Sequence, residues 1–120
     1  MEQPERTGLG ARGEDEAAEH YRQRGYRVLE RNWSCRLGEI DLILTKGETL
    51  VFCEVKTRRG SSLGGPYEAV TWKKQRTLRR LAEAFLVASG ARPADIRFDV
   101  ASVTVPAFGM PSLHVYENAF

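Results

Sequence analysis

The sequence predicts an α/β fold in which a mixed β-sheet is flanked by helices. Two segments, 13–24 and 66–89, carry apolar residues at helical spacing, and five shorter segments show the alternation or apolar runs of strands. The predicted strands are 26–33, 38–44, 50–56, 96–105 and 113–117. The order is therefore helix, three strands, helix, two strands, an arrangement that favours a mixed sheet in contact with helices. At 120 residues, the chain has the size of one domain.

The first predicted helix follows an N-terminal segment, 1–12, that contains two glycines, a proline and few apolar residues. We expect this segment to be a flexible arm and the domain to comprise residues 13–120. The acids 14–16 follow Gly13 and suit the positive end of a helix that stops at Gly25. One side of this helix collects Glu14, Ala17, Ala18 and Tyr21. Glu14 is thus expected to face inward, against the alternative that it is an ordinary acid at a helix start.

The second and third strands are predicted to form a hairpin that brings acidic side chains together. A two-residue turn at Gly47 and Glu48, of type II′, would place Asp41 opposite Glu54 and Glu39 opposite Lys56. Like charges in opposed positions destabilise a sheet by up to about 1 kcal/mol. A bound divalent cation would compensate for this repulsion. The alternative for Asp41, Glu54 and Lys56 is a structural salt bridge across the hairpin.

Strand periodicity also predicts which side chains of the hairpin share a face. In the third strand, Glu54 and Lys56 share the face of Phe52, and the other face carries Val51, Cys53 and Val55. In the second strand, Glu39 and Asp41 lie on one face. The opposite face of that strand is expected to carry Ile40, Leu42 and Leu44.

The second predicted helix begins at Pro66, ends near Ser89 and is stopped by Gly90. Its apolar stripe is Val70, Leu78, Leu81, Phe85 and Ala88. Lys74 lies on the same stripe, so it is positioned to reach the carboxylates. The segment 57–65 before this helix is rich in glycine and serine, and we expect it to be a flexible loop that orders on substrate.

Basic residues are concentrated between Lys56 and Arg80, where eight lysines and arginines accompany a single acid, Glu68. A basic stretch beside carboxylates suits an enzyme that holds a polyanion, whereas the alternative is a solvated helix face. The candidate nucleic-acid-binding residues are Arg58, Arg59, Lys73, Lys74, Gln75 and Arg76. Trp33 and Trp72 are candidates for stacking on bases, against the alternative of ordinary packing.

The composition excludes several other classes of protein. No apolar stretch approaches the roughly 20 residues needed to span a bilayer, so we expect no membrane partner and a cytoplasmic location. The two cysteines, Cys35 and Cys53, are too few for a disulfide framework. Neither belongs to a CxxC pair, so the sequence offers no obvious zinc site.

The arrangement of these residues resembles the PD-(D/E)xK nuclease superfamily, whose core is restriction-endonuclease-like. The shared pattern is an acid in the first helix, an aspartate in the second strand and Glu-x-Lys at the end of the third. More narrowly, the chain is similar to the YraN-like family of small bacterial proteins, relatives of archaeal Holliday junction resolvases. The segments that carry this likeness are 13–14, 38–43, 52–56, 70–75 and 97–100. Ile40 stands where the wider superfamily usually has proline, as is typical of the narrower family.

The resemblance implies a metal site and a role for each of its residues. Asp41 and Glu54 would coordinate Mg²⁺ or Mn²⁺ together with the carbonyl of Val55, and Glu14 would complete the site directly or through water. Lys56 would orient or help to deprotonate the attacking water. The resemblance further implies that Lys74 and Gln75 steady the phosphate or the nucleophile.

The expected activity is therefore that of a metal-dependent endonuclease that acts on DNA more readily than on RNA, on branched or otherwise structured substrates. A homodimer is expected, because cutting two strands requires two active sites. The alternative is a module that binds nucleic acid on a nuclease scaffold without cleaving it. A third alternative is an assembly protein whose basic helix meets an acidic partner.

Overall fold

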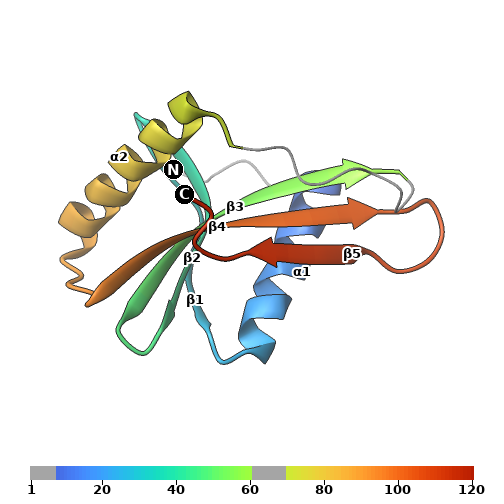
Figure 1. The fold of residues 1–120 in the computed structure, drawn as a ribbon, viewed down its shortest axis with the longest axis horizontal. Coiled ribbons are helices and arrows are strands. Elements are labelled where there is room, and N and C mark those ends of the chain that lie inside the picture. The colour runs from blue at the N-terminus through green and yellow to red at the C-terminus, as the bar shows by residue number, and fades with distance from the viewer. Residues whose placement is uncertain (1–7, 61–69) are drawn as a thin grey trace.

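The computed structural model describes residues 8–60 and 70–120, which form one five-stranded sheet with two helices (Figure 1). The elements are α1 (Gly8–Gln23), β1 (Arg27–Cys35), β2 (Gly38–Lys46), β3 (Thr49–Arg59), α2 (Trp72–Ser89), β4 (Asp95–Val105) and β5 (Ser112–Tyr116). The strands lie in the order of the sequence, so β1 and β5 are the edges. The pair β3 and β4 is parallel and the other three pairs are antiparallel, which confirms the predicted mixed sheet.

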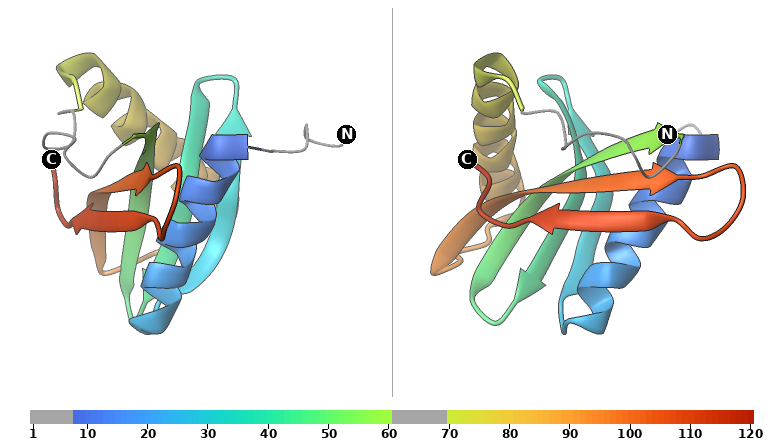
Figure 2. Two further views of the ribbon diagram at one scale, coloured as in Figure 1. Left: turned by 90° about the vertical axis from the view of Figure 1, so that its right-hand side faces the viewer. Right: turned by 45° about the vertical axis from the view of Figure 1, so that its right-hand side comes forward.

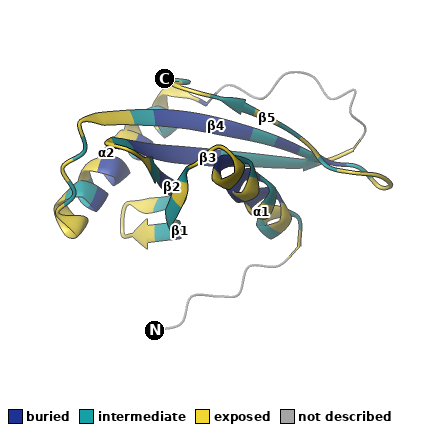
Figure 3. Cartoon of the chain, turned by 90° about the horizontal axis from the view of Figure 1, so that it is seen from below, coloured by how far each residue is buried: buried dark blue, intermediate teal, exposed yellow. Residues whose placement is uncertain are grey.

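The two helices cover opposite faces of the sheet, and each face has its own apolar core (Figure 2). The α1-side cluster consists of Ala17, Ala18, Tyr21, Leu42, Leu44, Val51, Cys53 and Ala101. The α2-side cluster consists of Ile40, Ile43, Leu50, Phe52, Val70, Leu78, Leu81, Ala82, Phe85, Phe98 and Val100. The central strands β3 and β4 contribute to both clusters and are buried over much of their length (Figure 3). Because β3 and β4 are buried on both faces, they are the most strongly stabilised strands of the sheet.

Helix α1 begins at Gly8, five residues before the predicted start at Gly13. Its buried face contains Glu14 and the three predicted apolar residues, so the inward orientation of Glu14 is confirmed. Because Glu14 lies well inside the helix and the first turn carries no acid, the alternative of a helix-start acid is wrong. Residues 8–12 are helical rather than part of an arm, and the remainder of the predicted arm, 1–7, lies outside the described residues.

Helix α2 begins at Trp72, later than the sequence suggested. The Thr71 hydroxyl accepts a hydrogen bond from the Lys74 N–H (3.1 Å), which makes Thr71 the residue that caps the helix. Pro66 lies outside the described residues. The C-terminal stop at Gly90 is confirmed, since its φ of 73° is a left-handed conformation that suits glycine. On the buried face, Ala82 takes the place predicted for Ala88, which is exposed.

Strand β3 is longer than predicted, because the expected loop at 57–65 does not begin at Thr57. Residues 57–59 instead pair with residues 103–105 of β4. The long neighbouring strand offers a backbone partner to each of these residues, and this outweighs their lack of apolar periodicity. Arg58 and Arg59 therefore lie on a strand, and the rest of the predicted loop, 61–65, lies outside the described residues.

Asp99 anchors α1 and the C-terminal segment to the sheet. Its side chain is fully buried on β4, and it accepts hydrogen bonds from the Tyr21 hydroxyl (2.7 Å) and the Asn118 N–H (3.0 Å). Two nitrogens of the Arg97 guanidinium donate to the same carboxylate (2.8 and 2.9 Å). A fully buried carboxylate needs such complete pairing, so the role of Asp99 is structural.

The helices of the described part of the chain are not long and apolar enough to cross a membrane.

A close contact between α1 and β3 yields a prediction about stability. A Cβ atom added at Gly13 would lie 2.8 Å from the Thr57 Cβ and closer still to its hydroxyl oxygen. We expect Gly13→Ala to lower the free energy of unfolding by about 1–3 kcal/mol, because the helix must shift away from the strand. Urea denaturation followed by circular dichroism would measure this change.

Gly10→Ala is the matched control, since a Cβ at Gly10 on the same helix meets no described atom within 4 Å. Here the gain in helix propensity should raise stability by roughly 0.5–1 kcal/mol. Equal effects of the two substitutions would contradict the close packing of Gly13 on Thr57.

Candidate functional site

The candidate site lies where β2 and β3 separate. Their pairing runs from Lys46 and Thr49 to Leu42 and Cys53, in the predicted register, and Gly47 has the positive φ (60°) expected in the turn. The ladder ends there, so the predicted opposition of Asp41 to Glu54 and of Glu39 to Lys56 lies beyond the last paired residues. Instead, the Asp41 carboxylate accepts a hydrogen bond from the Val55 N–H (2.7 Å). At this point of the sheet, a side-chain acceptor thus replaces the backbone acceptor that the Val55 N–H would have in a continued ladder.

The alternation of faces in β1 and β2 also breaks at this level. Asn32 of β1, between partners Arg31–Leu42 and Trp33–Ile40, has a φ of 53°. Asparagine tolerates this left-handed conformation better than most residues. Ile40 consequently packs in the α2-side cluster, whereas Leu42 and Leu44 pack in the α1-side cluster. The prediction that all three share a face was wrong, because strand periodicity assumes an unbroken strand.

The environment of Asp41 makes its ionised form unfavourable. The pKa of its carboxyl is raised to about 7, mainly by burial and next by the negative charge of Glu54. Glu14 and Glu39 add smaller contributions of the same sign to the Asp41 pKa, while the hydrogen bond from Val55 opposes them. Three other carboxylates, those of Glu54, Glu14 and Glu39, thus raise the pKa of Asp41.

Glu54 lies on the α2 side of the site and is only 8% exposed. The Lys74 ammonium of α2 lies 3.6 Å from one of its carboxylate oxygens. This contact confirms that Lys74 faces the carboxylates. Glu54 thus has a cation beside it in its buried position, which offsets part of the cost of burying a carboxylate.

Glu14 approaches from the α1 side and is 4% exposed. Its carboxylate accepts a hydrogen bond from the Asn32 side-chain amide (3.0 Å) and lies 3.7 Å from the Arg31 guanidinium. Sequence reasoning missed both partners. The sequence did carry one signal of these partners. Arg31 is followed by Asn32 within a predicted strand, and asparagine is depleted in strands.

Lys56 is half-buried two residues beyond Glu54. Its ammonium forms no ion pair with residues 8–60 or 70–120, so the alternative of a salt bridge across the hairpin is not observed in this part of the chain. Glu54 and Glu14 instead have cations from other elements beside them, Lys74 of α2 for Glu54 and Arg31 of β1 for Glu14. The Lys56 charge thus remains available beside the site.

The predicted nucleic-acid-binding residues are divided between two regions. Lys73, Lys74 and Arg76 lie on the first turns of α2, the part of the helix next to Glu54, and Lys73 and Arg76 are exposed. The Gln75 side-chain amide donates to the Val70 carbonyl (2.9 Å), so it helps to fix the start of the helix. Arg58 and Arg59 lie at the far end of β3.

The two tryptophans also differ in their surroundings. The Trp33 ring packs edge-on against Phe85, with ring centroids 5.4 Å apart, so Trp33 belongs to the core. Trp72, at the start of α2, is 79% exposed.

The donor atoms near Asp41 fit a hard divalent cation that keeps most of its waters. Across residues 8–60 and 70–120, no three histidine, cysteine, aspartate or glutamate side chains converge closely enough to form a complete protein cage for a metal. Magnesium does not require one, because it usually binds through one or two carboxylates plus water. Asp41 and Glu54, with the Val55 carbonyl, are such a set. Because Glu14 is already held by Asn32 and Arg31, the contact through water is the more favourable form of its predicted role.

The raised pKa of Asp41 leads to a prediction about the pH dependence of stability. The carboxyl titrates near pH 7 in the folded protein and near 3.8 when unperturbed, so the folded state binds more protons between these values. The free energy of unfolding should therefore fall as pH rises from about 4 to 7. Asp41→Asn keeps an acceptor for Val55 but removes this titration. We expect it to stabilise the protein above pH 7 by on the order of 2 kcal/mol relative to wild type.

Denaturant titrations without divalent cations, repeated between pH 4.5 and 8.5, would measure the effect. Glu48→Gln, in the exposed turn between β2 and β3, is the control and should leave the pH profile unchanged. A difference between Asp41→Asn and wild type that stays constant across this range would contradict the prediction.

Comparison with known proteins shows the family to which the chain belongs. The model of the family described as "Uncharacterised protein family UPF0102" matches residues 13–103, which include every acid of the candidate site. A UPF0102 protein of Rhodococcus jostii (strain RHA1) is 46% identical over 93% of this chain and 95% of its own length. A UPF0102 protein of Clavibacter michiganensis is 49% identical over 92% and 94%, respectively. The chain therefore belongs to the UPF0102 family, which confirms its likeness to YraN-like proteins.

Proposed function

We propose that this protein is a metal-dependent endonuclease of the PD-(D/E)xK type that hydrolyses phosphodiester bonds in DNA. The observation that supports the proposal is the pair of acids formed by half-buried Asp41 and buried Glu54, where the pairing of β2 and β3 ends. Burying two carboxylates side by side is costly unless a cation compensates for them. Glu54 has Lys74, but the raised pKa of Asp41 indicates that its charge is under-compensated by the protein alone.

In this proposal, Asp41, Glu54 and the Val55 carbonyl hold Mg²⁺ or Mn²⁺. The bound cation would stabilise charge on the phosphate and increase the acidity of water. Asp41 is oriented for this role by the Val55 N–H, which fixes one of its oxygens and leaves the other available. The Glu54 carboxylate is oriented in the same way by Lys74. Because both orienting groups belong to regular elements, the two acids are held before substrate arrives.

Lys56 is the residue that we assign to the attacking water. It extends from the same strand and face as Glu54, and its ammonium has no ion pair within the described part of the chain. From there it would orient the water for attack on phosphorus and offset the negative charge that accumulates as the bond to the leaving oxygen breaks. Lys74 would contribute positive charge on the other side of Glu54.

The first turns of α2 would hold the DNA backbone beside these groups. Lys73 and Arg76 are exposed there, and Lys74 connects this part of the helix with Glu54. Phosphate contacts of this kind provide most non-specific affinity for DNA. The exposed Trp72 lies among them and offers an aromatic face. A homodimer would supply the second active site needed to cut both strands.

A cleavage experiment tests this function. We expect the wild-type protein to cut plasmid or four-way-junction DNA in Mg²⁺ or Mn²⁺ and to lose at least about 100-fold in rate in Asp41→Asn, Glu54→Gln and Lys56→Ala, since each removes a reacting or charge-stabilising group. Glu48→Gln is the control and should retain the full rate. Electrophoresis of the products over time would measure the rates.

Products that form in EDTA, or equally well in Asp41→Asn, would contradict the assignment. DNA binding with no cleavage under any condition would favour the alternative of a non-cleaving nucleic-acid-binding module on a nuclease scaffold.

Metal binding is testable without DNA. At pH 8, Mn²⁺ at 100 times its dissociation constant should raise the free energy of unfolding of the wild type by about 2.7 kcal/mol. The same concentration should have little effect on Asp41→Asn, which lacks one of the two carboxylates. Thermal denaturation with increasing Mn²⁺, with Ca²⁺ at equal ionic strength for comparison, would measure the shift. If Mn²⁺ stabilised wild type and Asp41→Asn equally, the metal would bind at another site, and this would contradict the assignment.

A further inference from the structure

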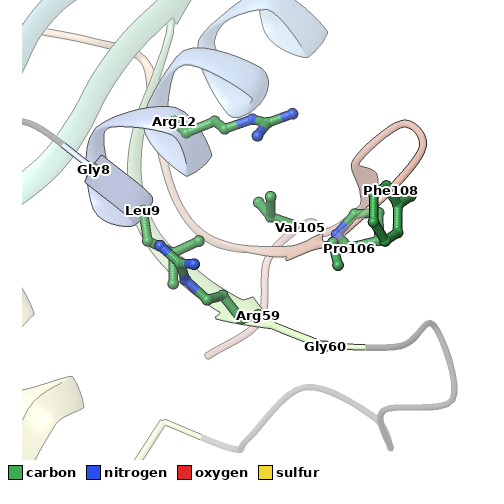
Figure 4. Close-up of a pocket in the computed structure, with 9 residues that line it drawn as sticks. Gly8, Leu9, Arg12, Arg59, Gly60, Val105, Pro106 and Phe108 are labelled. Atoms are coloured by element: carbon green, nitrogen blue, oxygen red, sulfur yellow. The ribbon is translucent and has the colours of Figure 1, made fainter.

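A cavity of about 810 Å³ lies outside the candidate site, where the start of α1 meets the ends of β3 and β4 (Figure 4). Its lining includes Leu9, Arg12, Arg59, Val105, Pro106 and Phe108. In Figure 4, Arg12 comes from the helix, Arg59 from β3, and Pro106 and Phe108 from the opposite wall beyond β4. We call this cavity the Arg12–Arg59 pocket. Three separate parts of the chain thus contribute an apolar wall and two cations.

The charges of this pocket indicate an anionic ligand. Arg12 and Arg59 both line it, and no acidic side chain is among the described residues that do. Neither guanidinium forms an ion pair with another described residue. Arginine presents a planar set of donors that matches phosphate oxygens, so two of them on one concave surface suit a phosphate-bearing ligand.

The aromatic wall indicates that the ligand also has a flat apolar part. Phe108 is 93% exposed, whereas Phe98 and Phe120 stack on each other in the core with ring centroids 5.2 Å apart. Exposing a phenylalanine ring to water is unfavourable, and a nucleic-acid base covers such a ring well. Bases within a duplex already have both faces stacked, so the fitting ligand is an unpaired nucleotide.

The pocket is connected to the candidate site by two regular elements. Arg59 is five residues beyond Glu54 on β3, which corresponds to about 17 Å along a strand. That distance equals about five stacked nucleotides at ~3.4 Å each. On α1, Arg12 is two residues before Glu14. One DNA strand could therefore reach both places.

We propose that the Arg12–Arg59 pocket binds an unpaired nucleotide of the DNA substrate, with Phe108 stacked on the base and the two arginines on the flanking phosphates. This inference rests on the proposed function, and it specifies the substrate class as DNA with a single-stranded segment roughly five nucleotides from the cut. A second copy of the chain fits the pocket less well, because a two-fold contact centred on it would bring the arginines of both copies together.

Binding is measured first, in EDTA and with the non-cleaving Asp41→Asn protein, so that the result does not depend on catalysis. The ligand is a fluorescein-labelled 12-nucleotide oligothymidylate, and fluorescence anisotropy reports its affinity. Phe108→Ser should weaken binding by roughly tenfold, as expected for the loss of one stacked base. Arg59→Ala should weaken it and lower the slope of log affinity against log salt by about 0.7.

Met110→Ser is the matched control. Met110 is 85% exposed on the same connection between β4 and β5 but does not line the pocket, so its loss should not change affinity. An oligonucleotide with abasic residues at all positions should bind equally to Phe108→Ser and to the parent protein, because no base remains to stack. Equal losses for Phe108→Ser and Met110→Ser would overturn the proposal.

Cleavage separates this inference from the proposed function. With otherwise wild-type protein in Mn²⁺, Phe108→Ser should slow the cutting of a duplex with a single-stranded overhang and leave the cutting of a blunt duplex unchanged. Active protein that cuts both substrates equally in wild type and Phe108→Ser would overturn the pocket but not the nuclease. Oligothymidylate binding that depends on Phe108 in a protein that never cuts would overturn the nuclease but not the pocket. A dimer that dissociates on Phe108→Ser in light scattering would show that a second copy covers this surface, against the proposal.

Discussion

The hydrogen bond from the Val55 N–H to the Asp41 carboxylate determines the arrangement around it. By taking the donor that would otherwise continue the ladder, Asp41 ends the pairing of β2 and β3 at Leu42 and Cys53. The pairing thus ends between β2 and β3, in the interior of the sheet rather than at its edge. Glu14 enters this region from the α1 layer and Lys74 from the α2 layer. A sheet with unbroken pairing would keep the two layers apart, so the site exists because one side chain interrupts it.

Other interactions offset the cost of interrupting the pairing of β2 and β3. Two of the acids have compensating groups, Lys74 for Glu54 and Asn32 with Arg31 for Glu14. The left-handed backbone at Asn32 lets β1 follow the change of direction in β2. Asp99 holds α1 against β4 at a distance from the site, so the repulsion between carboxylates does not push the helix away. Asp41 has no ion pair with the other described residues, and burial and the neighbouring acids raise its pKa.

Much of this architecture follows from local sequence signals. The alternation in β3, the inward Glu14 and the register set by Gly47 depend on periodicity and turn chemistry within a few residues, and all three were predicted correctly. The early start of α1 and the length of β3 were missed, because contacts between elements stabilise them against weak local preference. The kink at Asn32 and the Arg12–Arg59 pocket depend on residues distant in sequence, so no local pattern reveals them. The resemblance supplied the candidate roles of the acids, and geometry supplied their partners.

The position of β3 between two neighbours has a consequence for dynamics. This strand carries Glu54 and Lys56, pairs with β4 along its whole length and is buried on both faces over its first half. Amide protons in such a strand exchange with solvent only when the domain as a whole unfolds. The strand that carries Glu54 and Lys56 is therefore rigid except when the domain unfolds. In the proposed nuclease, any adjustment that brings a scissile bond into place would therefore come from distortion of the nucleic acid, which favours flexible discontinuities over uniform duplex.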